Sequence, residues 1–188
     1  MGMVVADMSV SLDGFVADPH DGVEHVFAWY GKPQPPESAA GDADTAAGLG
    51  VIVYGRRTFT LANGWDGRHP TGAPVLVVTH ELPGGWPREN STVSFETGGI
   101  EAAMRKAAEI AGDGVIALGS PNIIQQCLNL GLVDRIQVKV VPVLLGDGIR
   151  LFGPLTGAAV ELENPVITEG NGVTHMHYNI QGRGPGVG

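Results

Sequence analysis

Two adjacent arginines, Arg56 and Arg57, follow the apolar run VIVY (51–54) and Gly55 in a chain with few basic residues. Guanidinium groups bind phosphate through charge-assisted, often bidentate, hydrogen bonds. In an α/β sheet, a strand end followed by a helix N-terminus is a common ligand site, because the unpaired N–H groups of the helix carry partial positive charge. Together with Thr58 the pair indicates a phosphate-binding turn, with solvated first-turn residues as the alternative.

A second strand-to-helix turn lies in GVIALGSPNIIQ (114–125). Gly119 ends the expected strand, Ser120 is a residue type that caps helices, and Pro121 is favoured at the first helical position. For Ser120, a cap without any ligand role is the alternative. Two such turns, one of them doubly basic, predict a ligand that carries more than one phosphate.

The overall charge argues against polyanionic partners. Lys and Arg number 11 against 20 Asp and Glu, which gives a net charge of −9. We therefore expect neither a nucleic acid nor a membrane partner, and any bound anion must meet a local basic cluster. The single Cys127 excludes an intrachain disulfide, no apolar run is long enough to span a bilayer, and the N-terminal residues lack signal-peptide features. We expect a cytoplasmic protein with a small-molecule ligand.

Other side chains suggest chemistry less strongly. Asp13 in SLDG could act catalytically, but an Asp before Gly more often caps its own turn. His175 and His177 share one face of an expected strand, yet no third ligand accompanies them, so we expect no metal site. Trp29 and Tyr30 suit either stacking on a planar heterocycle or core packing. Both interpretations stay open.

The elements that must position these residues alternate between strand and helix. Strands are expected at the start of the chain, with a bend at Asp13-Gly14, and at 51–54, 74–79, 114–118 and 133–141. Helices are expected in GVEHVFAWY (22–30), between Gly99 and Gly112, and after Gly119 up to Gly131. Residues 159–180 read as two strands joined by a Gly-Asn-Gly turn. The pattern predicts an α/β fold with a mixed, mostly parallel sheet and a C-terminal antiparallel hairpin.

We expect one domain over residues 1–181 and a flexible tail over 182–188. The segment 31–48 is rich in Pro, Gly and small polar residues and reads as a surface loop that serves as a lid or an ornament.

Five segments in order resemble the dihydrofolate-reductase-like family, in the branch similar to the reductase domain of the riboflavin-biosynthesis deaminase-reductase (RibD). They are SLDGFVA (11–17), VYGRRTF (53–59), PVLVVTH (74–80), GVIALGS (114–120) and GLVDRIQVKVVPVLLGDGIRLF (131–152). The resemblance covers nearly the whole chain. It implies a single-domain, three-layer fold with helices on both faces of the sheet.

The same resemblance implies NADPH as cofactor. Arg56, Arg57 and Thr58 would hold its phosphates, with one arginine favouring the 2′-phosphate, and many relatives have Gly-Gly where this chain has Gly119-Ser120. Ser9, Val16 and Ala17 would flank the nicotinamide. The cofactor-binding residues implied in this way are Ser9, Val16, Ala17, Gly55, Arg56, Arg57, Thr58, Thr79, His80, Gly119, Ser120 and Asn122.

These observations lead us to expect an NADPH-dependent oxidoreductase, active as a homodimer, that passes a hydride to a small planar heterocycle of pterin, flavin or pyrimidine type. Ser11, Trp29 and Tyr30 would bind the substrate, and Asp13 or water would supply a proton. The deaminase half of the bifunctional enzyme needs paired cysteines, which this chain lacks. The alternative is a non-catalytic, nucleotide-binding dimeric protein that keeps the fold.

Overall fold

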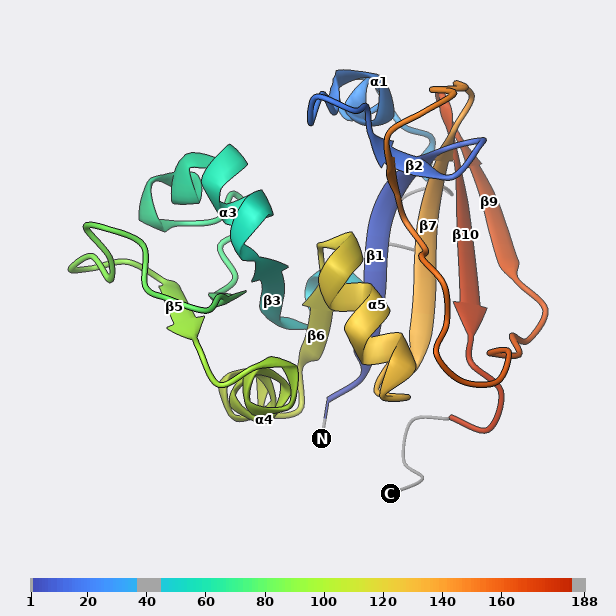
Figure 1. Ribbon diagram of the computed structural model, residues 1–188. Helices are drawn as coiled ribbons and strands as arrows, with labels where there is room; N and C mark the ends of the chain where they lie inside the picture. The colour runs from blue at the N-terminus through green and yellow to red at the C-terminus, as the bar shows by residue number, and fades with distance from the viewer. Residues whose placement is uncertain (1, 37–44, 184–188) are drawn as a thin grey trace. The chain divides into compact units, whose positions relative to one another are not determined.

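A computed structural model describes residues 2–36 and 45–183 (Figure 1). Two compact units share the chain: Met1–Val5 with Gly48–Leu132, and Ala6–Ala47 with Val133–Gly188. Much of the predicted 31–48 loop and most of the predicted tail lie outside the described residues, and a single domain over 1–181 stays a prediction. In the part that is described, no helix is both long and apolar enough to cross a membrane.

The first unit contains four parallel strands in the order β5-β4-β3-β6. Their bounds are β3 (Leu49–Gly55), β4 (Val75–Val78), β5 (Val93–Glu96) and β6 (Val115–Leu118). The apolar runs predicted as strands at 51–54, 74–79 and 114–118 are confirmed. The sequence analysis missed β5, a short strand at one end of this order, where two apolar residues alternate with Ser94 and Glu96.

Three helices of the first unit lie where helices were expected: α3 (Arg56–Leu61), α4 (Ile100–Ala111) and α5 (Pro121–Asn129). The short helix η1 (Asn63–Gly67) was not predicted. Helix α4 buries Ala103, Met104 and Ala107, which lie on one face of the helix. Past the end of α5 the chain turns at Gly131, whose φ of 62° favours glycine.

The second unit contains strands in the order β1-β7-β10-β9, and β1 (Val4–Ser11) begins in the first unit. The other bounds are β7 (Arg135–Val141), β9 (Val166–Gly170), β10 (Val173–Asn179), a two-stranded pair of β2 (Phe15–Ala17) with β8 (Ile149–Arg150), and helix α1 (Glu24–Phe27). Strand β10 pairs antiparallel with both β7 and β9. The predicted α/β class with its C-terminal antiparallel hairpin is confirmed.

One face of the second unit's sheet is polar although it is buried. The register places His175 opposite Lys139 and His177 opposite Gln137. Lys139 is 5% exposed and forms an ion pair with Asp7 on β1. Gln137 is 1% exposed and donates from Nε2 to the Thr45 hydroxyl at 2.8 Å. A buried face of this composition depends on its polar contacts, because desolvated polar groups are costly unless they are paired.

The Asp7–Lys139 pair predicts an asymmetric response to mutation. The Asp7 side chain is 27% exposed and that of Lys139 only 7%, so water can solvate the carboxylate but not the ammonium. Asp7→Asn should therefore lower the free energy of unfolding by about 3 kcal/mol, and Lys139→Met by only about 1 kcal/mol. Urea denaturation at pH 7 measures both values.

The control is Glu96→Gln, which removes the charge from a more exposed ion pair with Lys106 at 3.6 Å. We expect it to change stability much less than Asp7→Asn does, because solvent screens the Glu96–Lys106 pair. Equal costs for Asp7→Asn and Lys139→Met, or a larger cost for Lys139→Met, would contradict the proposed difference in solvation.

Candidate functional site

A single hydroxyl joins the two strand-to-helix turns of the first unit. The Oγ of Ser120 accepts the backbone N–H of Gly55 at 3.0 Å and lies 2.7 Å from the Thr58 hydroxyl. Ser120 occupies the predicted N-cap position of α5, but its side chain makes no hydrogen bond to that helix. The residue is 4% exposed, so the hydroxyl is buried between the two turns. A cap without further role, the alternative for Ser120, does not describe this arrangement.

The hydrogen-bond inventory at this junction leaves a donor for a ligand. A serine hydroxyl has one proton and two lone pairs. When Ser120 accepts from Gly55 and donates to Thr58, the Thr58 proton is free to be donated elsewhere. Thr58 is half-buried at the third residue of α3. The junction can therefore offer a hydroxyl donor beside the start of that helix.

The arginines beside this junction are exposed. Arg56 donates from Nε to the Thr60 hydroxyl at 3.3 Å and from Nη1 to the Glu81 carbonyl at 3.4 Å. Both distances are long for N–H···O hydrogen bonds, and both contacts are open to solvent, so they hold the guanidinium weakly. Arg56 can therefore exchange them for a phosphate at little cost, and the donor set suits an anion.

Gly119 is required by a neighbouring ring. A Cβ at this position would lie 2.2 Å from the Tyr54 ring, so only glycine fits without a shift. The Tyr54 ring also stacks on Trp65, at 4.7 Å between centroids, and its hydroxyl lies 3.2 Å from Nε2 of His69. Burial lowers the pKa of His69, which favours the neutral form of its imidazole.

The sequence analysis missed this aromatic cluster of Tyr54, Trp65 and His69. Trp65 has φ 49°, a left-handed conformation that is strained for a bulky residue. The only signal in the sequence was the Asn-Gly-Trp-Asp-Gly run, whose residue types favour positive φ at most of its positions.

The remaining predicted residues of the first unit have mainly structural contacts. Thr79 is buried and donates its hydroxyl to the Glu81 carbonyl at 2.8 Å, which shapes the turn after β4. His80 is exposed. Asn122 is exposed in the first turn of α5, where its Oδ1 accepts Nε2 of Gln126 at 2.6 Å. Of these three, His80 and Asn122 are exposed, and only Thr79 is buried.

In the second unit, the β1–β2 turn uses the side chains of Ser11 and Asp13. The Ser11 hydroxyl donates to Oδ1 of Asp13 at 2.6 Å and accepts the N–H of Phe15 at 2.9 Å. The Asp13 carboxylate also accepts the N–H groups of Leu145 and Gly146, at 3.1 and 2.7 Å. Asp13 therefore reaches a segment far along the chain, and Ser11 caps the local turn.

These hydrogen bonds decide the charge state of Asp13. The Ser11 hydroxyl, followed by the two backbone N–H groups, lowers the pKa of Asp13 below its usual value. At neutral pH the group is an ionised acceptor with its oxygens occupied, which makes it a poor proton donor. The geometry favours the structural interpretation of Asp13 over the catalytic one.

Trp29 belongs to the core, which decides between its two interpretations. The residue is 7% exposed and packs with Val141 and Val173. Its indole N–H donates to the Ser9 hydroxyl at 3.1 Å, which gives that hydroxyl one partner in the core. Tyr30, by contrast, is 64% exposed, with its ring 4.3 Å from that of Trp29. The nicotinamide-flanking residues predicted on β2, Val16 and Ala17, are each 5% exposed.

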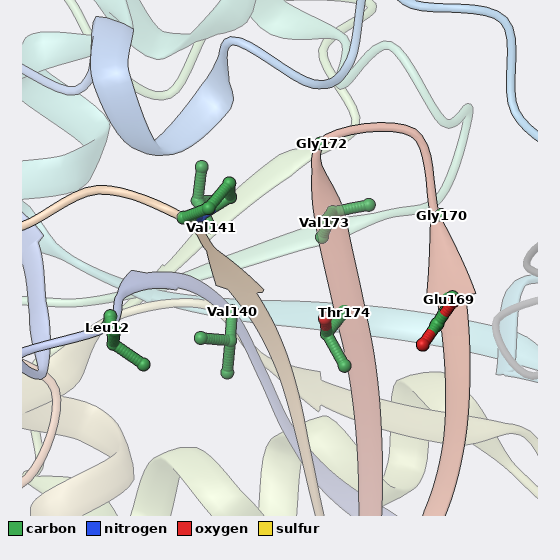
Figure 2. Close-up of a pocket in the computed structure, with 9 residues that line it drawn as sticks. Leu12, Val140, Val141, Glu169, Gly170, Gly172, Val173 and Thr174 are labelled. Carbon is green, nitrogen blue, oxygen red and sulfur yellow. The ribbon is translucent and has the colours of Figure 1, made fainter.

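A hollow of about 320 Å³ opens at one end of the second unit's sheet (Figure 2). One wall is formed by the ends of β1 and β7, and another by the β9–β10 hairpin. The lining is mostly apolar, with the carboxylate of Glu169 and the hydroxyl of Thr174 as its polar groups. The lining residues are Leu12, Val140, Val141, Pro142, Glu169, Gly170, Gly172, Val173 and Thr174. No predicted substrate residue lines it, but Leu12 lies between the predicted substrate residue Ser11 and the predicted catalytic residue Asp13.

Comparison with known proteins places this geometry in context. YwjB, an uncharacterized protein of Bacillus subtilis strain 168, is 24% identical over 149 residues, which are 79% of this chain and 82% of YwjB. The crystal structure of a candidate riboflavin biosynthesis protein from Shewanella sp. PV-4 matches with a TM-score of 0.74 and 22% identity, over 95% of this chain and 99% of that one.

Dihydrofolate reductase from Enterococcus faecalis, solved with NADP(H), has a TM-score of 0.62 and 15% identity, over 96% of this chain and 97% of that one. These structural likenesses show a shared fold. The family model described as the RibD C-terminal domain matches residues 3–169. That span holds SLDG and both strand-to-helix turns, and the chain accordingly belongs to the RibD C-terminal domain family.

Proposed function

We propose that this protein is an NADPH-dependent reductase whose substrate is a small planar heterocycle of pyrimidine, pterin or flavin type. The observation that carries the proposal is the Ser120 junction, which holds two strand-to-helix turns together beside the exposed Arg56 and Arg57. Membership of the RibD C-terminal domain family supports it. So does the fold shared with a dihydrofolate reductase that was solved with NADP(H).

The donor set of the first unit fits the phosphates of NADPH. Backbone N–H groups at the two turns and the Thr58 hydroxyl suit the pyrophosphate, and a guanidinium of Arg56 or Arg57 suits the 2′-phosphate. When bound, NADPH supplies the hydride for the reduction. This chain's residues hold the cofactor and set its register. We propose that His80, which is exposed after β4, also contacts NADPH.

In the second unit we propose that Val16 and Ala17 contact the nicotinamide and that Tyr30 contacts the substrate. Tyr30 is the predicted substrate residue with an accessible side chain, because it is 64% exposed while Ser11 and Trp29 are buried. The ionised Asp13 does not suit proton donation. We therefore propose water as the proton source for the reduced product.

The state of Asp13 also favours a second candidate function, a non-catalytic nucleotide-binding protein that keeps the fold. Asp13, the residue predicted to be catalytic, is ionised and accepts three hydrogen bonds, so it has no proton to donate to a substrate. The two functions separate in one experiment. Binding of NADPH without its oxidation across a panel of pterins, flavins and pyrimidines identifies the non-catalytic protein, and oxidation with any of them identifies the reductase.

Arg56 and Arg57 should select NADPH over NADH, because only NADPH carries the 2′-phosphate. Replacing both by alanine should weaken NADPH binding by about 10- to 100-fold, the equivalent of about 1.5–3 kcal/mol, and change NADH binding much less. Fluorescence titration with each nucleotide measures both constants.

The matched control is Arg68→Ala with Arg105→Ala, which removes the same charge from exposed positions of the same unit. It should leave both affinities within about twofold. An Arg56→Ala, Arg57→Ala variant that binds both nucleotides like the parent would show that these arginines are solvated helix residues.

The Ser120 hydroxyl should affect NADPH and NADH equally. Ser120→Ala leaves the Gly55 N–H without its acceptor and should lower stability by about 1–2 kcal/mol. Because the pyrophosphate is common to both nucleotides, both affinities should fall by a similar factor. Thermal unfolding and the same titrations give the two readouts.

Ser94→Ala is the control for Ser120→Ala. It removes a hydroxyl that donates to the Val75 carbonyl at 3.2 Å in the same unit, away from the turns. We expect a smaller loss of stability and unchanged nucleotide binding. A Ser120→Ala variant that loses affinity for NADPH alone would assign the hydroxyl to the 2′-phosphate instead.

We propose further that the protein is a homodimer. Several large apolar side chains of the second unit are exposed, at 68% for Leu12, 69% for Leu144, 64% for Val166 and 53% for Ile167. Their burial in a symmetric interface would be favourable, and two-fold dimers are the commonest oligomers. Light scattering at micromolar concentration should give twice the chain mass, and a monomer alone would overturn this proposal.

A further inference from the structure

The segment that follows β7 is tied to the β1–β2 turn by a set of hydrogen bonds. The N–H of Leu12 donates to the Val143 carbonyl at 2.9 Å, and that of Leu151 to the Gly14 carbonyl at 3.0 Å. Between these bonds the Asp13 carboxylate accepts the N–H groups of Leu145 and Gly146. We call residues 143–148 the clamped loop.

Val143, the first residue of the clamped loop, packs against the core around Trp29, and the loop has little apolar packing beyond it. Leu144 is 69% exposed, and Gly146 and Asp147 are exposed as well. Past the loop, the chain returns to the turn as β8, which pairs with β2. The fit there is tight, since a Cβ on Gly148 would lie 2.1 Å from the Ala17 carbonyl oxygen. Beyond Val143, the position of the loop therefore depends on hydrogen bonds more than on burial.

We propose that Asp13 is a positioning residue: its carboxylate holds the clamped loop against the β1–β2 turn and thereby sets β2, with Val16 and Ala17, and the wall of the neighbouring hollow. The part concerning β2 rests on the proposed function, in which these two residues contact the nicotinamide. The loop-holding role itself does not depend on that function.

The chemistry of the contacts explains why an ionised carboxylate is needed. Three donors converge on Asp13, namely the Ser11 hydroxyl and two consecutive backbone N–H groups. A carboxylate accepts at both oxygens, whereas a carboxamide has one oxygen and would turn its NH₂ group against an N–H. Hydrogen bonds to a charged acceptor are also the stronger kind. The lowered pKa of Asp13 reports the same stabilisation of the ionised form.

The hollow in Figure 2 lies next to this contact. Leu12 lines it immediately before Asp13, and Pro142 lines it immediately before Val143. The bond from Leu12 to Val143 joins the residues at this point of the wall. Loss of the Asp13 contacts therefore should loosen the wall of the hollow together with β2.

Amide hydrogen exchange of the whole chain, followed residue by residue by NMR, tests the proposal directly. Asp13→Asn should speed exchange at Leu145 and Gly146 by about tenfold or more. The matched control is Asp18→Asn, since the Asp18 carboxylate also accepts two backbone N–H groups, those of His20 and Gly22, at 2.7 and 2.8 Å. The control should speed exchange at His20 and Gly22 and leave the clamped loop unchanged.

Ser11→Ala is a milder second variant that keeps the test open should Asp13→Asn fail to fold. It removes one of the three donors and should speed exchange at Leu145 and Gly146 by a smaller factor. Unchanged exchange at these two amides in both variants would overturn the loop-holding role.

Activity measurements separate positioning from proton donation. A positioning role predicts that Asp13→Asn raises the KM for NADPH several-fold, keeps most of kcat and leaves the shape of the pH profile unchanged. Loss of kcat with unchanged amide exchange would instead make Asp13 catalytic and overturn the proposal. If the parent protein neither binds nor oxidises NADPH, the proposed function fails, and the exchange experiment still decides the role of Asp13 in the loop.

Discussion

The parallel pairing of β3 with β6 is the constraint on which the first unit's candidate site depends. Parallel strands end at the same edge, and the register of Val53 with Leu118 brings the two following turns side by side. The Gly119 N–H completes the pairing by donating to the Val53 carbonyl at 3.0 Å. At that point each strand gives way to a helix, so the Gly55 N–H needs an acceptor that no further ladder provides, and the Ser120 hydroxyl supplies it.

The same requirement takes a different form in the second unit. The clamped loop presents two consecutive N–H groups that belong to no strand, and the acceptor is the carboxylate of Asp13. At Gly55 the Ser120 hydroxyl suffices, because it accepts a single backbone N–H. Asp13 meets three donors, and this number favours an ionised group with two oxygens. In both units a short polar side chain joins backbone segments that are far apart in sequence.

The positions of the turns could be predicted from sequence because their signals are local. Gly119, Pro121 and Gly131 mark the ends of elements through their own backbone preferences, and β-branched runs mark the strands between them. The partners of Ser120 and Asp13 could not be predicted in this way. Ser120 contacts residues 62 and 65 positions earlier, and Asp13 contacts residues 132 and 133 positions later. A cap and a bridge use the same residue types, so only the folded chain distinguishes them.

The burial of the polar face of the second unit could not be predicted from the sequence either. Lys139 and Gln137 alternate with Ile136 and Val138, which from sequence is typical of a strand with one solvated face. The structure buries both faces, because Thr45 and Asp7 pair with the polar side chains. Trp29 was equally suited to a substrate or to the core, and its contacts with Ser9, Val141 and Val173 decide for the core.

The predicted site residues fall into two groups, those that form hydrogen bonds within the fold and those that are exposed to solvent. Ser9, Ser11, Asp13 and Ser120 are occupied within the fold, and each satisfies a donor or acceptor that would otherwise be left unpaired. Arg56, Arg57, His80 and Tyr30 are exposed and keep accessible charge or ring surface. In a chain with a net charge of −9, the exposed guanidiniums have no supporting long-range field, so their action on an anion must be short-ranged. A short-ranged contact depends on where the backbone holds it, and the buried hydroxyl of Ser120 fixes that backbone beside Arg56.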